Sequence, residues 1–244
     1  MQVAIKIDDY LGIGDKIQFS HIPENIYHFT GRKVLDISNS WIFDHNPFVD
    51  RINKTNYDII LNLWNESSFF PSDGFKSHAE RFFMYFNKKF STNFKNPILR
   101  HPRLYAYENL DIQTNRVIVH TTGKSETFQM TDEVIEHIRN IYKNYEIWQI
   151  GGLNDKPTPF KNMLGLSEWD TVRTIASSAI FIGVNSGMMN IAKCYPRVFK
   201  KILIPRDVES FTPMSKDNVW FDYNSAYFNY TKYDIGSTFS YLKI

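Results

Sequence analysis

Short apolar runs alternate with segments of helical periodicity along the first half of the chain. Residues 3–7 form an apolar run that ends in two aspartates and a glycine turn, which predicts a strand. Apolar positions within residues 17–29 are spaced for one helical face, and Gly31 is placed to end that helix. Residues 34–37 and 57–63 read as two further strands. The first half therefore alternates strands with helices.

The same alternation restarts in the second half. Ser77 and Glu80 have capping-box spacing and predict a last helix in the first half, whereas residues 91–114 lack periodicity and read as the crossing between halves. Beyond the crossing, Thr131 and the pair Ser167 and Asp170 are placed to cap two helices. The expected strands are 117–120, 147–150, 179–182 and 201–204, and the expected helices cover 134–142, 169–176 and 188–193.

Two successive strand-helix series predict an α/β protein with two domains, each a Rossmann-like, doubly wound parallel sheet. We expect an N-terminal domain over residues 1–113 and a C-terminal domain over residues 114–244, with the last segment packing back. The two sheets are expected to face each other across a cleft. Ligands bind such sheets at the carboxyl ends of their strands, where the predicted glycine turns lie.

Composition and charge narrow the class of protein. The chain has 244 residues, of which 43% are hydrophobic and 22% charged, so it can bury a core and is not a disordered chain. A net charge of +2 argues against tight nucleic-acid binding. The most apolar run, residues 179–184, is six residues long, too short to span a membrane. Cys194 is the only cysteine, which excludes an internal disulfide and favours a cytoplasmic location.

The first candidate site is the turn G-I-G-D after the first strand. Gly12 and Gly14 let the backbone approach a ligand closely, and the amides that follow favour anionic or polar atoms. Asp15 is either a general base at the cleft or a residue that caps the helix and complements its dipole, and the spacing leaves both open. We include Lys16 among the binding residues of this turn.

Three further turns follow predicted strands of the second half. The segment N-S-G-M-M-N opens a helix, so its amides can cradle a phosphate, although taken alone it also fits an ordinary serine-capped turn, somewhat better than a ligand site. The segment H-T-T-G-K-S offers hydroxyls, an amide and a lysine to phosphate oxygens. The third turn is the pair Gly151 and Gly152, directly after the predicted strand at residues 147–150. The expected binding residues are His120, Thr121, Thr122, Gly123, Lys124, Gly151, Gly152, Asn185, Ser186, Gly187, Met188 and Asn190.

Several catalytic motifs are absent from the sequence. There is no H-E-x-x-H, no G-x-S-x-G and no D-x-D pair to hold a metal for a nucleotide. We therefore expect neither a bound metal nor another cofactor.

The order of the motifs resembles that of the family 9 glycosyltransferases, the bacterial heptosyltransferase type. The resemblance rests on G-I-G-D, N-P-F-V-D (residues 46–50), H-T-T-G-K, the glycine pair, and the stretch from Asn162 to Lys193 that contains N-M-L-G-L-S-E-W-D-T-V and N-S-G-M-M-N-I-A-K. It implies a GT-B fold and a metal-independent, inverting transfer of a heptose or other sugar from a nucleotide-sugar donor. The implied acceptor is a glycan or glycolipid of the bacterial surface, lipopolysaccharide core or capsule, reached at the inner face of the cell membrane.

Residue by residue, the resemblance gives Asp15 the role of the base that deprotonates the acceptor hydroxyl. Amides around Ser186 to Met188, with Thr122 and Lys124, would hold the diphosphate leaving group. Two residues depart from the family pattern D-S-G-x-x-H, since Asn185 replaces its acid and Asn190 its histidine. The chain is also shorter than typical members, mostly in the acceptor half.

These departures leave two other functions open. The chain is alternatively a nucleotide-sugar-binding or partner protein that has lost turnover, which the two asparagines favour and the retained Asp15 opposes. A nucleotide-sugar epimerase on the same fold is a further alternative.

Overall fold

The computed structural model contains two compact units, with a boundary between Ala106 and Tyr107. The structure describes residues 2–51, 57–62, 84, 86–88, 91–93, 102–123, 128–184, 186–198 and 200–204. The expected boundary fell after residue 113. The helix expected after Ser77 lies largely outside the described residues, as does the C-terminal segment expected to pack back. No helix among the described residues is long and apolar enough to cross a membrane.

The first unit is built on a parallel sheet with the strand order β3-β2-β1-β4. Its strands are β1 (Val3–Lys6), β2 (Val34–Asp36), β3 (Val49–Asp50) and β4 (Ile59–Asn62). The apolar run of β1 is central, and Val3, Ala4 and Ile5 are fully enclosed because neighbours cover both faces of the strand. Three of the four strands were predicted, and β3 is too short to have a recognisable pattern.

The helical segment of the first unit differs from the prediction. One helix was expected up to Gly31, but the chain forms α1 (Ile13–Gln18) and α2 (Ile22–Thr30). Pro23 explains the break, because proline lacks the backbone N–H of a helix interior and occupies the first turn of α2 instead. Gly31 ends α2 with a positive φ of 68°, as predicted. A short 3-10 turn, η1 (Trp41–Phe43), follows β2.

The second unit is a five-stranded parallel sheet with the order β11-β10-β5-β8-β9. The strands are β5 (Gln113–His120), β8 (Glu146–Gly151), β9 (Lys161–Leu164), β10 (Ser178–Val184) and β11 (Lys200–Ile204), beside a small ribbon of β6 (Thr122–Gly123) and β7 (Phe128–Gln129). All seven residues of β10 are buried, as expected for a strand covered on both faces. This unit confirms the predicted α/β class.

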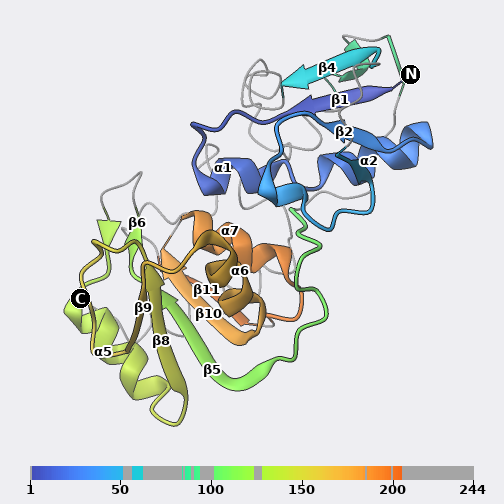
Figure 1. The fold of residues 1–244 in the computed structure, drawn as a ribbon. Coiled ribbons are helices and arrows are strands. Elements are labelled where there is room, and N and C mark those ends of the chain that lie inside the picture. The colour runs from blue at the N-terminus through green and yellow to red at the C-terminus, as the bar shows by residue number, and fades with distance from the viewer. Residues whose placement is uncertain are drawn as a thin grey trace. The chain divides into compact units, whose positions relative to one another are not determined.

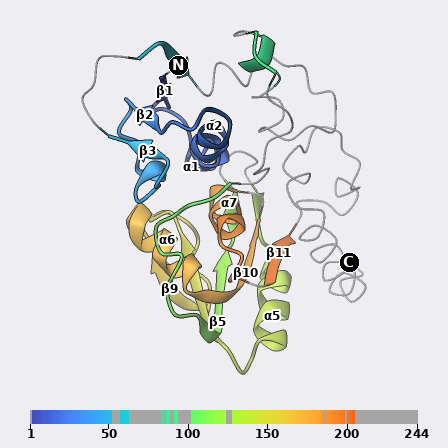
Figure 2. The same ribbon diagram turned by 90° about the vertical axis from the view of Figure 1, so that its right-hand side faces the viewer.

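Three helices cover this sheet, with α5 (Asp132–Ile141) on one face and α6 (Glu168–Ala176) and α7 (Gly187–Cys194) on the other (Figures 1 and 2). Both predicted caps are present. The Thr131 hydroxyl accepts a hydrogen bond from the Val134 amide, and the Ser167 hydroxyl accepts one from the Asp170 amide. The edge strand β9 was not predicted because K-N-M-L has too few apolar positions to form a pattern.

Candidate functional site

The order of strands in the second unit identifies where a ligand would bind. From β5 the chain moves outward to β8 and β9 on one side, and then returns to β10 and β11 on the other side of β5. The strand order therefore reverses between β5 and β10: the chain adds strands on one side of β5 first and then on the other side. We call this point the reversal of the sheet. In open α/β sheets, such a reversal leaves a crevice at the carboxyl ends of the two strands, where ligands bind.

His120 and Ser186 are joined across this reversal. His120 is the last residue of β5, and Ser186 lies between β10 and α7. The Ser186 Oγ and the His120 Nδ1 are 3.0 Å apart, within hydrogen-bonding distance. Gly183 of β10 is paired with His120, and its hydrogen leaves room for the enclosed Phe181 ring, since a Cβ there would lie 2.6 Å from that ring. Two predicted site residues from different motifs are thus brought together.

Burial keeps the imidazole of His120 neutral. The residue is 5% exposed, and this burial lowers the pKa of His120 to about 4, although the negative charge of Asp155 opposes the shift. At neutral pH the ring therefore has one donor and one acceptor nitrogen. A neutral ring can exchange a hydrogen bond with the Ser186 hydroxyl without adding charge to the site.

Among the described helices of this unit, α7 has the N-terminus best suited to an anion. Ser186 is its N-cap residue, but the serine side chain makes no capping hydrogen bond, and the first turn has no acidic residue. The described helices α5 and α6 differ, since both have a side-chain cap and acids in the first turn. The amides at the start of α7 are consequently open to a negatively charged ligand, which the helix dipole would attract.

The predicted residue Asn190 and the nearby Lys193 lie further along α7 than its open first turn. Asn190 is 4% exposed, and its amide donates to the Ser186 carbonyl within the helix. Lys193 is half-buried in the last turn, and burial lowers the pKa of Lys193 to about 8. Gly187 and Met188, in the first turn, are partly exposed and closer to the open end.

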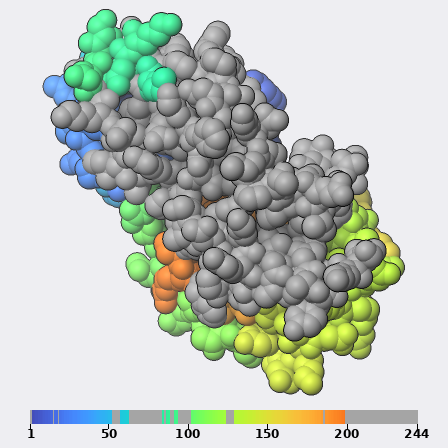
Figure 3. Space-filling model, turned by 180° about the vertical axis from the view of Figure 1, so that it is seen from behind, coloured from blue at the N-terminus to red at the C-terminus, as the bar shows by residue number. Residues whose placement is uncertain are grey.

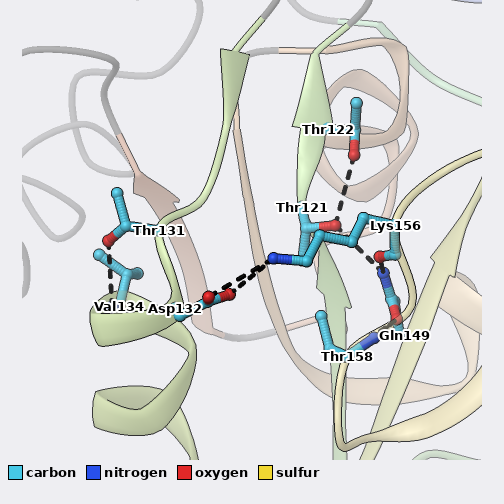
Figure 4. A network of polar contacts seen from close by, with 8 residues as sticks. All are labelled: Thr121, Thr122, Thr131, Asp132, Val134, Gln149, Lys156 and Thr158. Atoms are coloured by element: carbon cyan, nitrogen blue, oxygen red, sulfur yellow. Dashed lines mark hydrogen bonds and ion pairs between the residues drawn. The ribbon is translucent and has the colours of Figure 1, made fainter.

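Gln149 supports the end of β5 from within the sheet (Figure 4). This fully buried side chain donates to the Thr121 hydroxyl at 3.1 Å and to the Lys156 carbonyl at 2.8 Å. It also accepts hydrogen bonds from the Thr158 amide and hydroxyl. Thr121 is fully buried, so its hydroxyl serves this network, whereas the hydroxyl of Thr122 lies 3.5 Å away at a partly exposed position.

The glycine pair at the end of β8 begins a tight turn that contains Asp155. The Gly152 amide donates to the Asp155 carboxylate at 2.9 Å. A Cβ on Gly151 would collide with that carboxylate, so only glycine fits there. The turn therefore holds an acidic group near the edge of the sheet where His120 also ends.

The first unit has an equivalent reversal, between β1 and β4. Asp8 follows β1, and its carboxylate accepts a hydrogen bond from the Asn62 side chain at the end of β4, at 3.0 Å. This hydrogen bond, with the nearby Lys6 ammonium, lowers the pKa of Asp8 below its usual range. Asp8 is thus an ionised carboxylate where the strands β1 and β4 end.

The predicted turn G-I-G-D lies at the same edge. Gly12 is the N-cap of α1, and Asp15 is the third residue of that helix, so Asp15 is not its cap residue. Gly14 and Lys16 are partly exposed in α1. The side chain of Asp15 lies outside the described part of the structure, as do Lys124 and Asn185.

The sequence analysis did not identify four polar residues that lie at or near the carboxyl ends of the strands in the two sheets. Gln149 and Asp155 of the second unit and Asp8 and Asn62 of the first were not proposed. A signal existed for Asp8, which follows an apolar strand and precedes the glycine turn. Nothing in a single sequence distinguishes Gln149 from a surface residue, because its hydrogen-bond partners are set by the folded sheet.

The shifted pKa of His120 predicts how stability depends on pH. Between pH 6.5 and 4 the unfolded chain binds a proton on His120 that the folded protein excludes. The free energy of unfolding should therefore fall as the pH is lowered through this window, by up to about 3 kcal/mol. Urea unfolding of wild type and His120→Asn at several pH values measures this difference.

His120→Asn should flatten the pH dependence. The matched control is His45→Asn, because His45 is exposed and asparagine tolerates its positive φ of 59°. The control should keep the wild-type slope. An unchanged slope in His120→Asn would contradict the assignment of a neutral, buried imidazole.

No protein-family model and no curated protein matches the chain. Comparison with solved structures does find similar folds. The chain aligns with the dodecameric, iron-containing heptosyltransferase TibC of enterotoxigenic Escherichia coli, in complex with ADP-D-beta-D-heptose, at a TM-score of 0.58 and 16% identity. This alignment covers 84% of the chain and 58% of TibC, so the chain spans less than two thirds of that protein.

Two other similar structures match over most of both chains. The E. coli heptosyltransferase WaaC with ADP gives a TM-score of 0.60 at 12% identity, covering 83% of this chain and 87% of WaaC. A family 9 glycosyltransferase from Veillonella parvula DSM 2008 gives 0.59 at 11% identity, covering 86% and 87%. Among the described residues, no group of three His, Cys, Asp or Glu side chains is placed to hold a metal ion.

Such low identities establish the fold alone. The predicted class is confirmed: the chain has the two-unit α/β architecture of the GT-B type seen in heptosyltransferases.

Proposed function

We propose that the protein is a glycosyltransferase that binds the diphosphate of a nucleotide-sugar donor at the N-terminus of α7. The observation that carries this proposal is the open first turn of α7, which lies at the reversal of the sheet. Amides of Gly187 and Met188 would bind phosphate oxygens, and the helix dipole would favour their negative charge. No acidic side chain of that turn opposes it.

The His120–Ser186 pair would shape this donor site. A hydrogen bond between them fixes the hydroxyl beside the first amides of α7. When the His120 Nδ1–H donates to the Ser186 oxygen, the serine O–H remains free to donate to a phosphate or sugar oxygen. The similar structures of TibC and WaaC, solved with ADP-heptose and ADP, support a nucleotide sugar as the ligand class. The donor sugar is a heptose or another sugar.

For the acceptor, we propose that Asp15 removes the proton of the attacking hydroxyl. The hydroxyl oxygen then forms a bond to the anomeric carbon while the bond to the diphosphate breaks, which inverts the configuration. The departing diphosphate carries the electron pair and is stabilised by the amides of α7, with Thr122 and Lys124 as further contacts. As the resemblance implies, this step uses no metal ion.

We further propose a bacterial surface glycan, either lipopolysaccharide core or capsule, as the acceptor, with the enzyme at the cytoplasmic face of the membrane. The ionised Asp8 supports an acceptor rich in hydroxyl groups, since a carboxylate accepts their hydrogen bonds. Its position at the carboxyl edge of the first sheet is where a ligand of that unit would lie.

A second candidate function is a nucleotide-sugar-binding protein without turnover. It is favoured by Asn185 and Asn190, which stand where the family pattern has an acid and a histidine. An asparagine forms hydrogen bonds but transfers no proton. Donor binding without transfer to any acceptor in a panel would identify this function.

Placing an acid in the first turn of α7 tests the donor site. Met188 is partly exposed there, and Met188→Glu should weaken ADP binding about tenfold or more, because its carboxylate repels the diphosphate. Isothermal titration calorimetry measures the affinity, and the melting temperature without ligand reports folding. Gln113→Glu, an exposed site at the start of β5, is the charge-matched control. Equal ADP affinity in the two variants would refute the proposed donor site.

Removing the proposed base tests catalysis. Asp15→Asn should lower kcat by about 10²- to 10⁴-fold, with ADP affinity unchanged, because general base catalysis contributes about that factor. The assay follows ADP release from ADP-heptose with core oligosaccharides, in the presence of a chelator. Asp9→Asn removes an exposed, neighbouring carboxylate and should keep wild-type activity. Wild-type kcat in Asp15→Asn would show that another group is the base.

A further inference from the structure

A groove lies at the opposite end of the second unit's strands, where β8 and β9 begin. It encloses about 630 Å³ and is formed by the last turn of α5 and the starts of β8 and β9. Its lining residues are Glu136, Arg139, Asn140, Tyr142, Lys143, Tyr145, Ile147, Pro159, Phe160 and Lys161. Atoms in the yellow-green of α5 form part of the surface in Figure 3. The volume is in the range of small-ligand sites.

The groove is separate from the proposed donor site. The six residues of β8 run from Glu146, beside the groove, to Gly151 at the donor edge. At about 3.3 Å per residue, the strand separates the two places by roughly 17–20 Å. A ligand in the groove would therefore not be the nucleotide of the donor site.

An aromatic platform forms one wall of the groove. Tyr145 is 40% exposed, whereas Tyr142 is 6% exposed, and their rings meet edge to face at a centroid distance of 5.5 Å. A backbone hydrogen bond from the Tyr145 amide to the Tyr142 carbonyl, at 2.8 Å, fixes the turn between them. Tyr145 is thus held in place with much of its side chain open, and the apolar face of a sugar ring can stack on such a surface.

Cations outnumber acids in the groove. Arg139, Lys143 and Lys161 line it, with Glu136 as the acidic lining residue. Arg139 is held by Glu136 at 3.2 Å, but Lys143 has no ion-pair partner within the described part of the chain. Because Lys161 also lies near a glutamate, Lys143 is the cation best placed to pair with a carboxylate or phosphate of a ligand.

The side chain of Lys161 is held by neighbouring residues before any ligand binds. Its ammonium lies 4.1 Å from the centre of the Trp148 ring and 3.7 Å from a Glu146 oxygen. Arg116 lies over the same ring at 3.7 Å. Cations held on an aromatic ring lose less freedom when a ligand binds, so this side of the groove is preorganised.

We propose that this groove is a second binding site, for an anionic carbohydrate. A sugar ring stacks on Tyr145, and its carboxylate or phosphate lies between Lys143 and Arg139, with Asn140 available to hydroxyls. The site lies apart from the donor and would hold a glycan chain at the enzyme, which raises the local concentration of its ends.

Binding of defined oligosaccharides to the full-length protein tests this site. The probe is a tetrasaccharide of galacturonic acid, compared with the same tetrasaccharide after carboxyl reduction and with inorganic phosphate. By calorimetry, Tyr145→Ala and Lys143→Ala should each weaken tetragalacturonate binding about fivefold or more, because they remove the platform and a charge. Arg173→Ala, an exposed cation on α6 outside the groove, should leave the affinity unchanged.

The comparison of ligands separates the parts of the proposal. The reduced tetrasaccharide should bind more weakly, and phosphate should not displace tetragalacturonate at equal concentration. Absent binding, or full affinity in both groove variants, would overturn the site. Equal binding of the reduced sugar would overturn the anionic preference, and displacement by phosphate would overturn carbohydrate recognition. ADP affinity should be unchanged in Tyr145→Ala and Lys143→Ala, so this test is independent of the donor site.

Discussion

The hydrogen bond between His120 and Ser186 is the contact on which the proposed site depends. It joins the ends of two adjacent parallel strands at the point where the sheet reverses direction. Because the Ser186 side chain pairs with His120, it does not cap α7, and the first amides of that helix are left without a side-chain partner from their N-cap residue. One pairing thus positions a hydroxyl and leaves a helix N-terminus open to an anion.

The histidine of this pair is buried and neutral at pH 7. Burial lowers the pKa of His120 to about 4. On the neighbouring strand, Gly183 has no Cβ and so leaves room for the Phe181 ring. Gln149 supports the next residue, Thr121, and ties it to the segment that follows β8. Gln149 and Gly183 act without touching a ligand, because they hold the ends of the strands that carry the site residues.

The sequence predicted the architecture better than the site. Central strands such as β1, β5 and β10 were found because their buried residues form a continuous, largely apolar run, which in β5 covers only its last four residues. The helices α5 and α6 were found by their caps. The edge strands β3 and β9 were missed, since two and four residues form no pattern. Among site residues, motifs identified His120 and Ser186 separately. Their contact depends on strand order, which a single sequence does not specify, and the same holds for Asp8 with Asn62.

The central claim is that a nucleotide diphosphate binds the start of α7, and a crystal structure of the full-length protein with ADP tests it most directly. We expect the β-phosphate oxygens within about 3 Å of the amides of Gly187 and Met188, beside the Ser186 hydroxyl. A diphosphate bound away from α7, with these amides in contact with water alone, would contradict the account.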